Sequence, residues 1–389
     1  MKSQNSLFSY DSLRYVMAHL DPLVRFQLST HCPSLKNLHN LLPLKIENLQ
    51  ITPSTCTVNT TTFKIGIVRK YNDNNRIPNF VVQQNADGGL QYDTDRYGLP
   101  PIERAVRGHD ELVDYAERVL QELEITRLID MARMQEDMQM LKLRANNSDP
   151  PFTMFFRITI TPFWEDPKYI HLVHYKTLQE VKDAWMSKIL GTQSTIHVKY
   201  LDVRNGLHDR RQAFDLVEYL HHRRDSPTLI KVPYFAFTTR RLNVSKMSIN
   251  WNAQRALEAI RPVLDDRSPL KLLQISSSHG VIPRDPIIQS AEFLKVTGFL
   301  NLETLKDLQN VRVHLEENIP TKGIVRGLVE YWKRSGIRVG THFSIGCKYV
   351  EEVNELCNWF GAVPGATKEV LEGIRRVGPE HPPVTIFYR

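Results

Sequence analysis

The densest group of titratable side chains in the sequence is the run His221-His222-Arg223-Arg224. Paired histidines can bind a metal ion, but neighbours on a helix point about 100° apart and do not share a face. We interpret this run as the solvated end of a helix, where cations are favoured. His314 and Glu316 would share one face of a strand, yet no cysteine pair accompanies them as in a zinc deaminase. These residues therefore predict no metal site.

Motifs for nucleotide binding and covalent catalysis are missing as well. The nearest approach to a phosphate-binding loop, Gly361–Lys368, has the wrong spacing and lacks the Gly-Lys pair that such a loop requires. The sequence contains no GxGxxG motif after an expected strand, no HExxH and no GxSxG. We therefore expect a protein that is not an enzyme and that uses no cofactor. An α/β enzyme with an unrecognised site stays open as a third hypothesis.

The composition is that of an ordinary globular chain. Its 389 residues are 41% hydrophobic and 24% charged, and this length predicts two or three domains. The net charge of +7 is spread along the chain and forms no basic stripe, so we expect no nucleic-acid partner. The four cysteines form no CxxC pair. No run of about 18 apolar residues occurs, and Met1–Tyr10 lacks the apolar core of a signal peptide. These features predict an intracellular protein, cytoplasmic or nuclear, that binds no membrane.

Residues 1–50 are expected to form a small helical domain. The apolar residues of its first helix recur at three- and four-residue spacing, which is typical of an amphipathic helix. They are Leu13, Val16, Met17 and Leu20. Asp21-Pro22 is a turn signal that separates this helix from a second short one. A third helix ends at Pro43, and the alternation that follows over residues 44–49 predicts a strand.

Residues 51–150 are expected to form a β meander with one long helix. A Thr-rich loop over residues 52–62 precedes strands at Phe63–Ile67 and Phe80–Val82. Ile102–Ala145 contains no proline and keeps a helical spacing of apolar residues, which predicts a helix of roughly 60 Å. Two interpretations of this helix stay open. It either lies partly on the body of the protein and partly in solvent, or it forms a coiled-coil arm for a partner.

Residues 151–389 alternate between strand and helix patterns. Strands are expected at residues 152–161, 196–203, 242–247, 270–276, 294–299, 311–315, 343–345 and 384–388. Helices are expected at residues 177–189, 211–222, 252–264, 287–293, 302–308, 322–335 and 350–360. Repeated strand–helix units imply mainly parallel pairing. The uneven spacing leaves a leucine-rich-repeat-like solenoid and an open sheet as alternatives, and we favour a curved open sheet with helices on one side. The fold class is therefore α+β or α/β.

Three stretches of the sequence together resemble one protein family. They are SYDSLRYVMAHLDPLVRFQLSTHCPSLKNLHNLLPLKIENLQI, IHVKYLDV and LVEYWKRSGIRVGTHFSIGC, at residues 9–51, 196–203 and 328–347. With the charged helix that lies between the first two, this combination is similar to the nematode-expanded F-box proteins of the F-box C group, which carry a domain of unknown function. The resemblance runs along most of the chain and is specific as a combination.

The resemblance implies a function. F-box modules are short helical hairpins that dock on a Skp-type adaptor of cullin-RING ubiquitin ligases, and the C-terminal domain of such proteins holds a protein substrate. The docking residues implied here are Tyr10, Leu13, Val16, Leu20, Pro22, Leu23 and Arg25. The same apolar residues could instead anchor the helices to the β domain. The resemblance does not identify the substrate-binding residues.

Two functional hypotheses follow from these patterns. The first is a non-enzymatic substrate-recognition adaptor of a Skp–cullin–F-box ubiquitin ligase. The alternative is a stand-alone interaction scaffold that uses the long helix and has lost the link to the ligase. Both agree with the missing catalytic motifs, since both leave chemistry to other proteins.

Overall fold

The architecture was determined as a computed structural model. The structure describes residues 9–52, 54–72, 77–99, 128–190, 195–204, 242–250, 253–265, 269–316, 322–336, 338, 340–346, 350–362 and 383–387. The helices are α1 (Tyr10–His19), α2 (Pro22–His31), η1 (Pro33–Leu35), α3 (Lys36–Leu41), α4 (Asn79–Ala86), α6 (Leu128–Ala145), α7 (Leu178–Leu190), α9 (Ala253–Ile260), η4 (Arg261–Val263), α10 (Pro286–Ser290), α11 (Leu302–Asp307), α12 (Lys322–Ser335) and α13 (Val350–Gly361). The strands are β1 (Leu44–Ile51), β2 (Thr55–Val58), β3 (Thr61–Tyr71), β4 (Phe152–Pro162), β5 (Lys168–Val173), β6 (Ile196–Arg204), β7 (Leu242–Asn250), β8 (Leu272–Gly280), β9 (Phe293–Leu300), β10 (Arg312–Glu316), β11 (His342–Gly346) and β12 (Pro383–Phe387).

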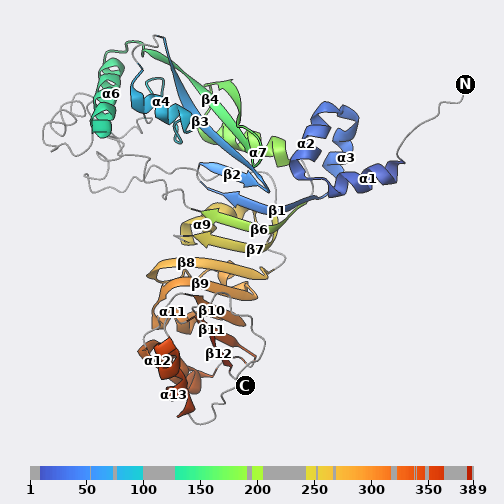
Figure 1. Cartoon of the computed structure of the whole chain (residues 1–389), viewed down its shortest axis with the longest axis vertical. Coiled ribbons are helices and arrows are strands. Elements are labelled where there is room, and N and C mark those ends of the chain that lie inside the picture. Colours follow the sequence, from blue (N-terminus) through green and yellow to red (C-terminus); the bar gives the residue numbers. More distant parts are fainter. Residues whose placement is uncertain are drawn as a thin grey trace, which may run out of the picture.

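One mixed sheet contains every described strand (Figure 1). Its order is β12-β11-β10-β9-β8-β7-β6-β1-β2-β3-β4-β5. The strands from β1 through β6 to β11 are parallel, whereas β12 and the meander from β1 to β5 pair antiparallel. The expected combination of an N-terminal helical part with a large sheet flanked by helices is confirmed.

The parallel half of the sheet has features of both architectures that the sequence left open. From β6 to β11 each strand pairs with the next described strand along the chain, as in a solenoid. Crossovers between parallel strands have a fixed hand, so sequential strands place their helices on the same face. Figure 1 shows α9, α11, α12 and α13 gathered along one side of this half. The sheet is therefore open, with helices on one side, and its strands follow chain order.

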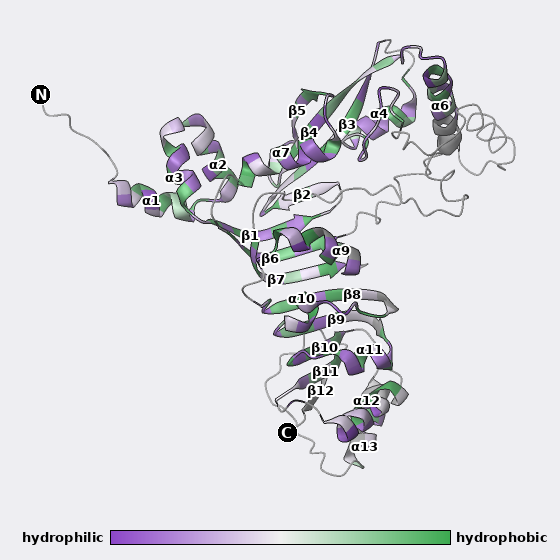
Figure 2. Ribbon diagram, turned by 180° about the vertical axis from the view of Figure 1, so that it is seen from behind, coloured by the Kyte–Doolittle hydropathy of each residue, from purple (hydrophilic) through white to green (hydrophobic). Residues whose placement is uncertain are grey.

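A single hydrophobic core runs the length of the sheet. Each parallel strand contributes alternate apolar side chains to it, because successive residues of a strand point to opposite faces. The ribbons of β6 and β7 accordingly carry both hydrophobic and hydrophilic residues (Figure 2). These are Leu201 and Val203, Met247 and Ile249, Leu273 and Ile275, Leu294 and Val296, Val313 and Leu315, and Phe343 and Ile345. The helices α7 and α9–α13 cover this face with apolar residues of the same core. The opposite face carries the polar residues that alternate with them.

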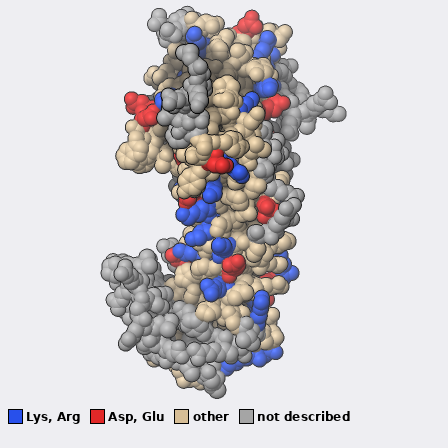
Figure 3. Space-filling view, turned by 90° about the vertical axis from the view of Figure 1, so that its right-hand side faces the viewer, with Lys and Arg blue, Asp and Glu red and all other residues tan. Residues whose placement is uncertain are grey.

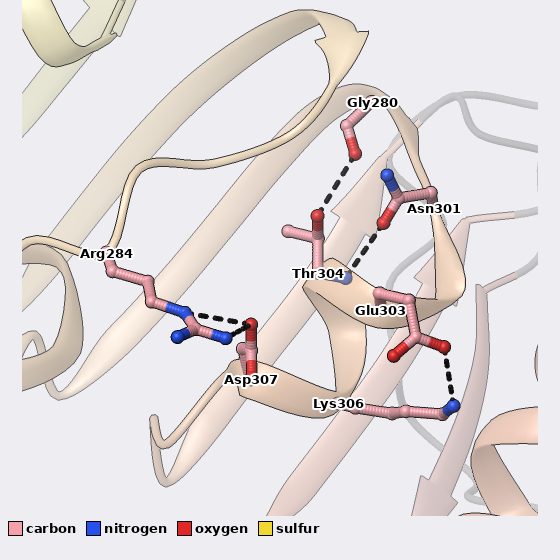
Figure 4. Close-up of polar contacts among 7 residues, drawn as sticks. All are labelled: Gly280, Arg284, Asn301, Glu303, Thr304, Lys306 and Asp307. Atoms are coloured by element: carbon pink, nitrogen blue, oxygen red, sulfur yellow. Dashed lines mark hydrogen bonds and ion pairs between the residues drawn. The ribbon is translucent and has the colours of Figure 1, made fainter.

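The short helix α11 shows how one strand–helix unit is closed (Figure 4). Asn301 accepts a hydrogen bond from the backbone amide of Thr304 at 2.8 Å, which caps the helix. The Thr304 hydroxyl donates to the carbonyl of Gly280, the last residue of β8, which pairs with the strand before α11. Arg284 pairs with Asp307 at 2.6 Å. The side chains of Asn301 and Thr304 thus form hydrogen bonds with backbone groups at the start of α11 and the end of β8.

Two sequence predictions in the meander were wrong. The strand expected at Phe80–Val82 is part of the helix α4, which follows Pro78. Phe80 and Val81 pack into a second core while Val82 is exposed, so the apolar triplet covers two sides of a helix. The loop expected over residues 52–62 contains the strand β2. Its cysteine and valine are buried, and the threonines that alternate with them are half-buried.

Other predictions are confirmed in part. The expected strand–helix alternation beyond residue 151 agrees with the described elements, and β5 is an additional strand. Of the long helix expected over Ile102–Ala145, only α6 is described; its Met140 and Leu141 pack into the second core beside Tyr71. Residues 100–127 and the helix expected at residues 211–222 lie outside the described residues. The sheet continues across both predicted domain boundaries, since β1 pairs with β6 and β3 with β4. Among the described helices, none is both long and apolar enough to cross a membrane.

Candidate functional site

The three N-terminal helices form a module that projects from the end of β1 (Figure 1). Ser9 and Asp21 cap α1 and α2 by accepting hydrogen bonds from backbone amides of the first turn. Pro22 is the first residue of α2, a position where its missing N–H costs nothing. The small core of the module consists of Met17, Leu38 and Leu42, with Leu13, Ala18, Leu20 and Leu35 packed against it.

Arg25 holds the module together from inside. Its side chain is only 1% exposed, and its Nε donates to Nδ1 of His39 at 3.1 Å. Its Nη2 donates to the carbonyls of His39 at 2.5 Å and Leu42 at 2.7 Å, and its Nη1 donates to that of Pro43 at 2.9 Å. The last carbonyls of a helix have no partner within the helix. The guanidinium therefore caps the end of α3 and ties α2 to it.

The charge state of this pair follows from its burial. Burial, and then the charge of Arg25, lower the pKa of His39 to about 4. Burial alone lowers the pKa of Arg25 to about 10, so the guanidinium stays charged at neutral pH. His39 is then neutral and its Nδ1 can accept the hydrogen bond from Arg25. The pair fixes the shape of the module and is not available to a partner.

The docking residues implied by the family resemblance lie in different environments. Tyr10 and Val16 on α1 are exposed, at 62% and 44%. The other five are partly or wholly turned inward and are Leu13, Leu20, Pro22, Leu23 and Arg25. Leu23 packs against the main core of the sheet. It therefore anchors the helices to the β domain, which is the alternative role that the sequence left open for these residues. Only the first two side chains present a large surface to a partner.

Further apolar side chains of the module are exposed that sequence reasoning did not select. They are Tyr15, Val24, Leu28 and Leu41. Val24 and Leu28 lie one turn apart on the outer side of α2, a spacing that was visible in the sequence. We call these four residues, together with Tyr10 and Val16, the exposed apolar set.

Asn59 fixes the module against the sheet. Its Nδ2 donates to Oδ2 of Asp21 at 2.7 Å. Its Oδ1 accepts hydrogen bonds from the backbone amides of Glu47 and Asn48, at 3.0 and 3.2 Å. Asn59 has a φ of 53°, a left-handed conformation that asparagine tolerates better than most residues. The turn between β2 and β3 thus sets the orientation of α2.

A second candidate surface is the sheet face opposite the helices. The strand register aligns one polar residue from each of seven neighbouring strands. This polar row is Gln50, Asp202, Ser248, Gln274, Lys295, His314 and Ser344. At a strand spacing of about 4.8 Å, the row extends over roughly 30 Å. Sequence reasoning missed it because alignment across strands depends on register.

Several members of the polar row are paired. Nδ1 of His314 lies 2.8 Å from Oγ of Ser344, and Lys295 pairs with Glu316 at 2.7 Å. Burial lowers the pKa of His314, outweighing the opposing effect of Glu316. The imidazole is therefore neutral at neutral pH. Asp202 and Ser248 are buried and the other five residues are half-buried, so the row offers a few hydrogen-bonding groups and little charge.

Asp202 differs from the rest of the row. Its side chain is 7% exposed, and one carboxylate oxygen accepts from Nε of Arg204 at 2.7 Å. The other oxygen, Oδ1, is buried without a hydrogen-bond partner among the described residues. Burial raises the pKa of this carboxyl. Because unsatisfied buried polar atoms are rare in native proteins, Asp202 is the residue of the row that most needs a further donor.

The structure brings together no catalytic group that the sequence pointed to. His314 and Glu316 share a face, but the described residues contain no cluster of three or more metal-ligating side chains. His221–Arg224 and most of Gly361–Lys368 lie outside the described residues. Cys32 is exposed and Cys56 is buried, and both are free thiols.

Comparison with known proteins identifies one region of the chain. Residues 226–349 match a domain of unknown function, DUF3557. This region contains the strands β7 to β11 and therefore most of the polar row. No curated protein and no solved structure matches the chain.

Proposed function

We propose that this chain is a non-enzymatic substrate-recognition adaptor of a cullin-RING ubiquitin ligase. The module of α1–α3 docks on a Skp-type adaptor, and the sheet face that bears the polar row holds a protein substrate. The observation that carries the proposal is the exposed apolar set on a module whose shape is fixed internally by Arg25. The family resemblance of the N-terminal sequence supports the same assignment.

The energetics of the exposed apolar set support docking. Large apolar side chains gain roughly 25 cal/mol for each Å² removed from water. Six such side chains are exposed on three helices that together contain 26 residues. Burying them against a partner would therefore contribute favourable free energy that the free chain does not have. Exposed apolar surface of this kind marks interaction sites, and helical faces commonly fill a groove of a partner.

The polar row suits the second role. A row of hydrogen-bonding groups along neighbouring strands matches an extended polypeptide better than a small molecule, because its length is roughly 30 Å. Figure 3 shows Lys and Arg along the middle of one side of the molecule with Asp and Glu between them. Mixed charges of this kind favour protein partners with complementary charges.

The separation of the two surfaces is a further argument. The module projects from the sheet on one side of β1, whereas the polar row extends from β1 toward β11 (Figure 1). An adaptor and a substrate could therefore be bound at once. Catalysis by other subunits agrees with the missing motifs in the sequence.

The experiment is binding of the full chain to a purified Skp-type adaptor, measured by calorimetry. Val16→Asp and Val24→Asp replace exposed members of the apolar set, so the fold should persist while binding is lost. Val281→Asp is the matched control, since Val281 is 58% exposed at a distant position. Adaptor binding that survives both module variants, or none in the parent chain, contradicts the proposal. The second outcome leaves the interaction scaffold as the alternative.

A further inference from the structure

The outermost strand of the meander has an unusual surface. β5 is the last strand in the order of the sheet, and within the described chain only β4 pairs with it. All six of its residues are exposed. A strand with one unpaired edge offers a row of free backbone N–H and C=O groups to another strand.

Large apolar side chains gather around this edge. Of the exposed large apolar residues, those on β5 and its flanks are Phe163, Trp164, Tyr169, Ile170, Leu172, Val173 and Tyr175. Trp164 is 88% exposed and packs edge-on against Phe163 with ring centroids 4.4 Å apart. Monomeric proteins usually protect such edges with charges, prolines or bulges. Here Pro167 and Lys168 protect only the first end of the strand.

Both faces of β5 contribute to this apolar surface. Ile170 and Leu172 lie opposite Ile158 and Phe156 of β4, on the face of the main core. Tyr169 and Val173 lie on the other face, opposite Thr159 and Phe155. A partner strand would therefore have to be apolar on both faces as well.

The charged residues near β5 are negative before the strand and positive after it. Glu165 and Asp166 precede it, and Lys176 follows it. Lys168 pairs with Glu165 at 2.6 Å within the same hairpin. Asp166 and Lys176 thus lie at opposite ends of the strand, which is the arrangement that an antiparallel second copy would complement.

We propose that β5 pairs antiparallel with β5 of a second copy of this chain, about a twofold axis at His171. In this register Ile170 meets Leu172 of the second copy, and Tyr169 meets its Val173. Asp166 meets Lys176 at both ends. A twofold axis perpendicular to the sheet keeps equivalent faces on the same side, so these pairs share a face. The two sheets become one.

The centre of this interface is compatible with the pairing. The two copies of His171 face each other there. Burial, and then Arg157, lower the pKa of His171, so neither imidazole is charged at neutral pH. Nε of Arg157 donates to Nε2 of His171 at 3.1 Å within its own chain. The next two pairs on each side, Ile170 with Leu172 and Tyr169 with Val173, are apolar, which stabilises adjacent strands. Beyond them Lys168 meets His174 of the second copy, and Pro167 meets its Tyr175.

The test is the oligomeric state of the full chain, measured by sedimentation equilibrium. We expect a dimer in the parent protein. Val173→Lys should weaken the dimer at least about tenfold, because the lost pair occurs twice. Val82→Lys is the matched control, since Val82 is an exposed valine on α4. Circular dichroism of each variant checks that the fold is kept.

A charge exchange tests the register. Lys176→Asp should weaken the dimer because it places two acidic residues opposite each other, and adding Asp166→Lys should restore it. A monomeric parent chain, a dimer unaffected by Val173→Lys, or failure of the double variant to recover would each overturn the proposal. A monomer that binds another protein through β5 would do the same. None of these outcomes depends on adaptor binding by the N-terminal module.

Discussion

The side chain of Arg25 donates a hydrogen bond from Nε to Nδ1 of His39 over 3.1 Å, between two buried groups. We expect Arg25→Met to destabilise the module by roughly 3 kcal/mol, because it leaves the buried carbonyls of His39 and Leu42 without this donor. Hydrogen exchange of the backbone amides in α2 and α3, measured in the full chain by mass spectrometry, reads this loss locally.

Arg14→Met is the control for this variant, since Arg14 is exposed on α1. It should change exchange in the module very little. Equal exchange in the two variants would show that the guanidinium of Arg25 does not hold the module together.

Stability of the module should depend on pH through His39. Its pKa is about 4 in the fold, against about 6.5 for an ordinary histidine, so protonation favours the unfolded form. The contribution of neutral His39 to the free energy of unfolding is complete above pH 6.5 and is lost as the pH falls through 4. Its full size is roughly 3 kcal/mol. Protection of the amides in α2 and α3, which is their exchange relative to the intrinsic rate at the same pH, should therefore fall over this range in the parent chain and much less in His39→Asn. The same fall in both proteins would exclude His39 as the cause.

Asp202→Asn should stabilise the protein at neutral pH. Burial raises the pKa of Asp202, so the charged form is penalised in the fold. Its stabilising contribution is present below the ordinary pKa of an aspartate and is lost as the pH rises through the higher folded value. We expect the variant to gain about 1 kcal/mol at pH 7, since the lost partner Arg204 is largely exposed. Urea unfolding measures this, with the exposed Asp149→Asn as control; a loss of stability would mean that the carboxylate is satisfied in solution.

Gly298→Ala should destabilise the parallel sheet. Gly298 has a φ of +104°, and a Cβ there would lie 2.0 Å from the carbonyl oxygen of Ser277 on β8. The pairing of β8 and β9 shifts register just beyond this point. We expect a loss of roughly 3 kcal/mol in urea unfolding. Gly323→Ala on α12 is the control, because nothing lies within 4 Å of the added methyl group; similar losses in both would contradict the steric explanation.

The parallel half of the fold could be predicted because its strands alternate regularly. In β10, Val313 and Leu315 face the core while His314 between them is polar, and each strand from β6 to β11 contains at least one such apolar–polar–apolar triplet. Such a period of two identifies strands without knowledge of their neighbours. Their order and the polar row could not be predicted, since both depend on which strands pair.

The meander was less predictable for physical reasons. β5 is exposed on both faces, so no burial pattern distinguishes it from a loop. Phe80 and Val81 face a core that also needs Tyr71 and Met140 from distant segments. The family resemblance assigned Arg25 to a partner. Its burial could not be predicted, because charged residues are rarely buried and its acceptors at the end of α3 become visible only in the fold. Long-range contacts therefore decided the cases of α4 and Arg25.

The parallel pairing of β1 with β6 has a consequence for synthesis of the chain. Glu47 on β1 and Lys199 on β6 form an ion pair at 2.6 Å although they are 152 residues apart. At typical translation rates β1 waits roughly ten to thirty seconds for this neighbour. Meanwhile the hairpins β2–β3 and β4–β5 need only local contacts and can fold on the ribosome. They join through β3 and β4, whose partners lie 81 to 101 residues apart, still before β6 is made. We expect co-translational folding to begin in the meander, which then offers β1 as the template on which β6 and each later strand are added.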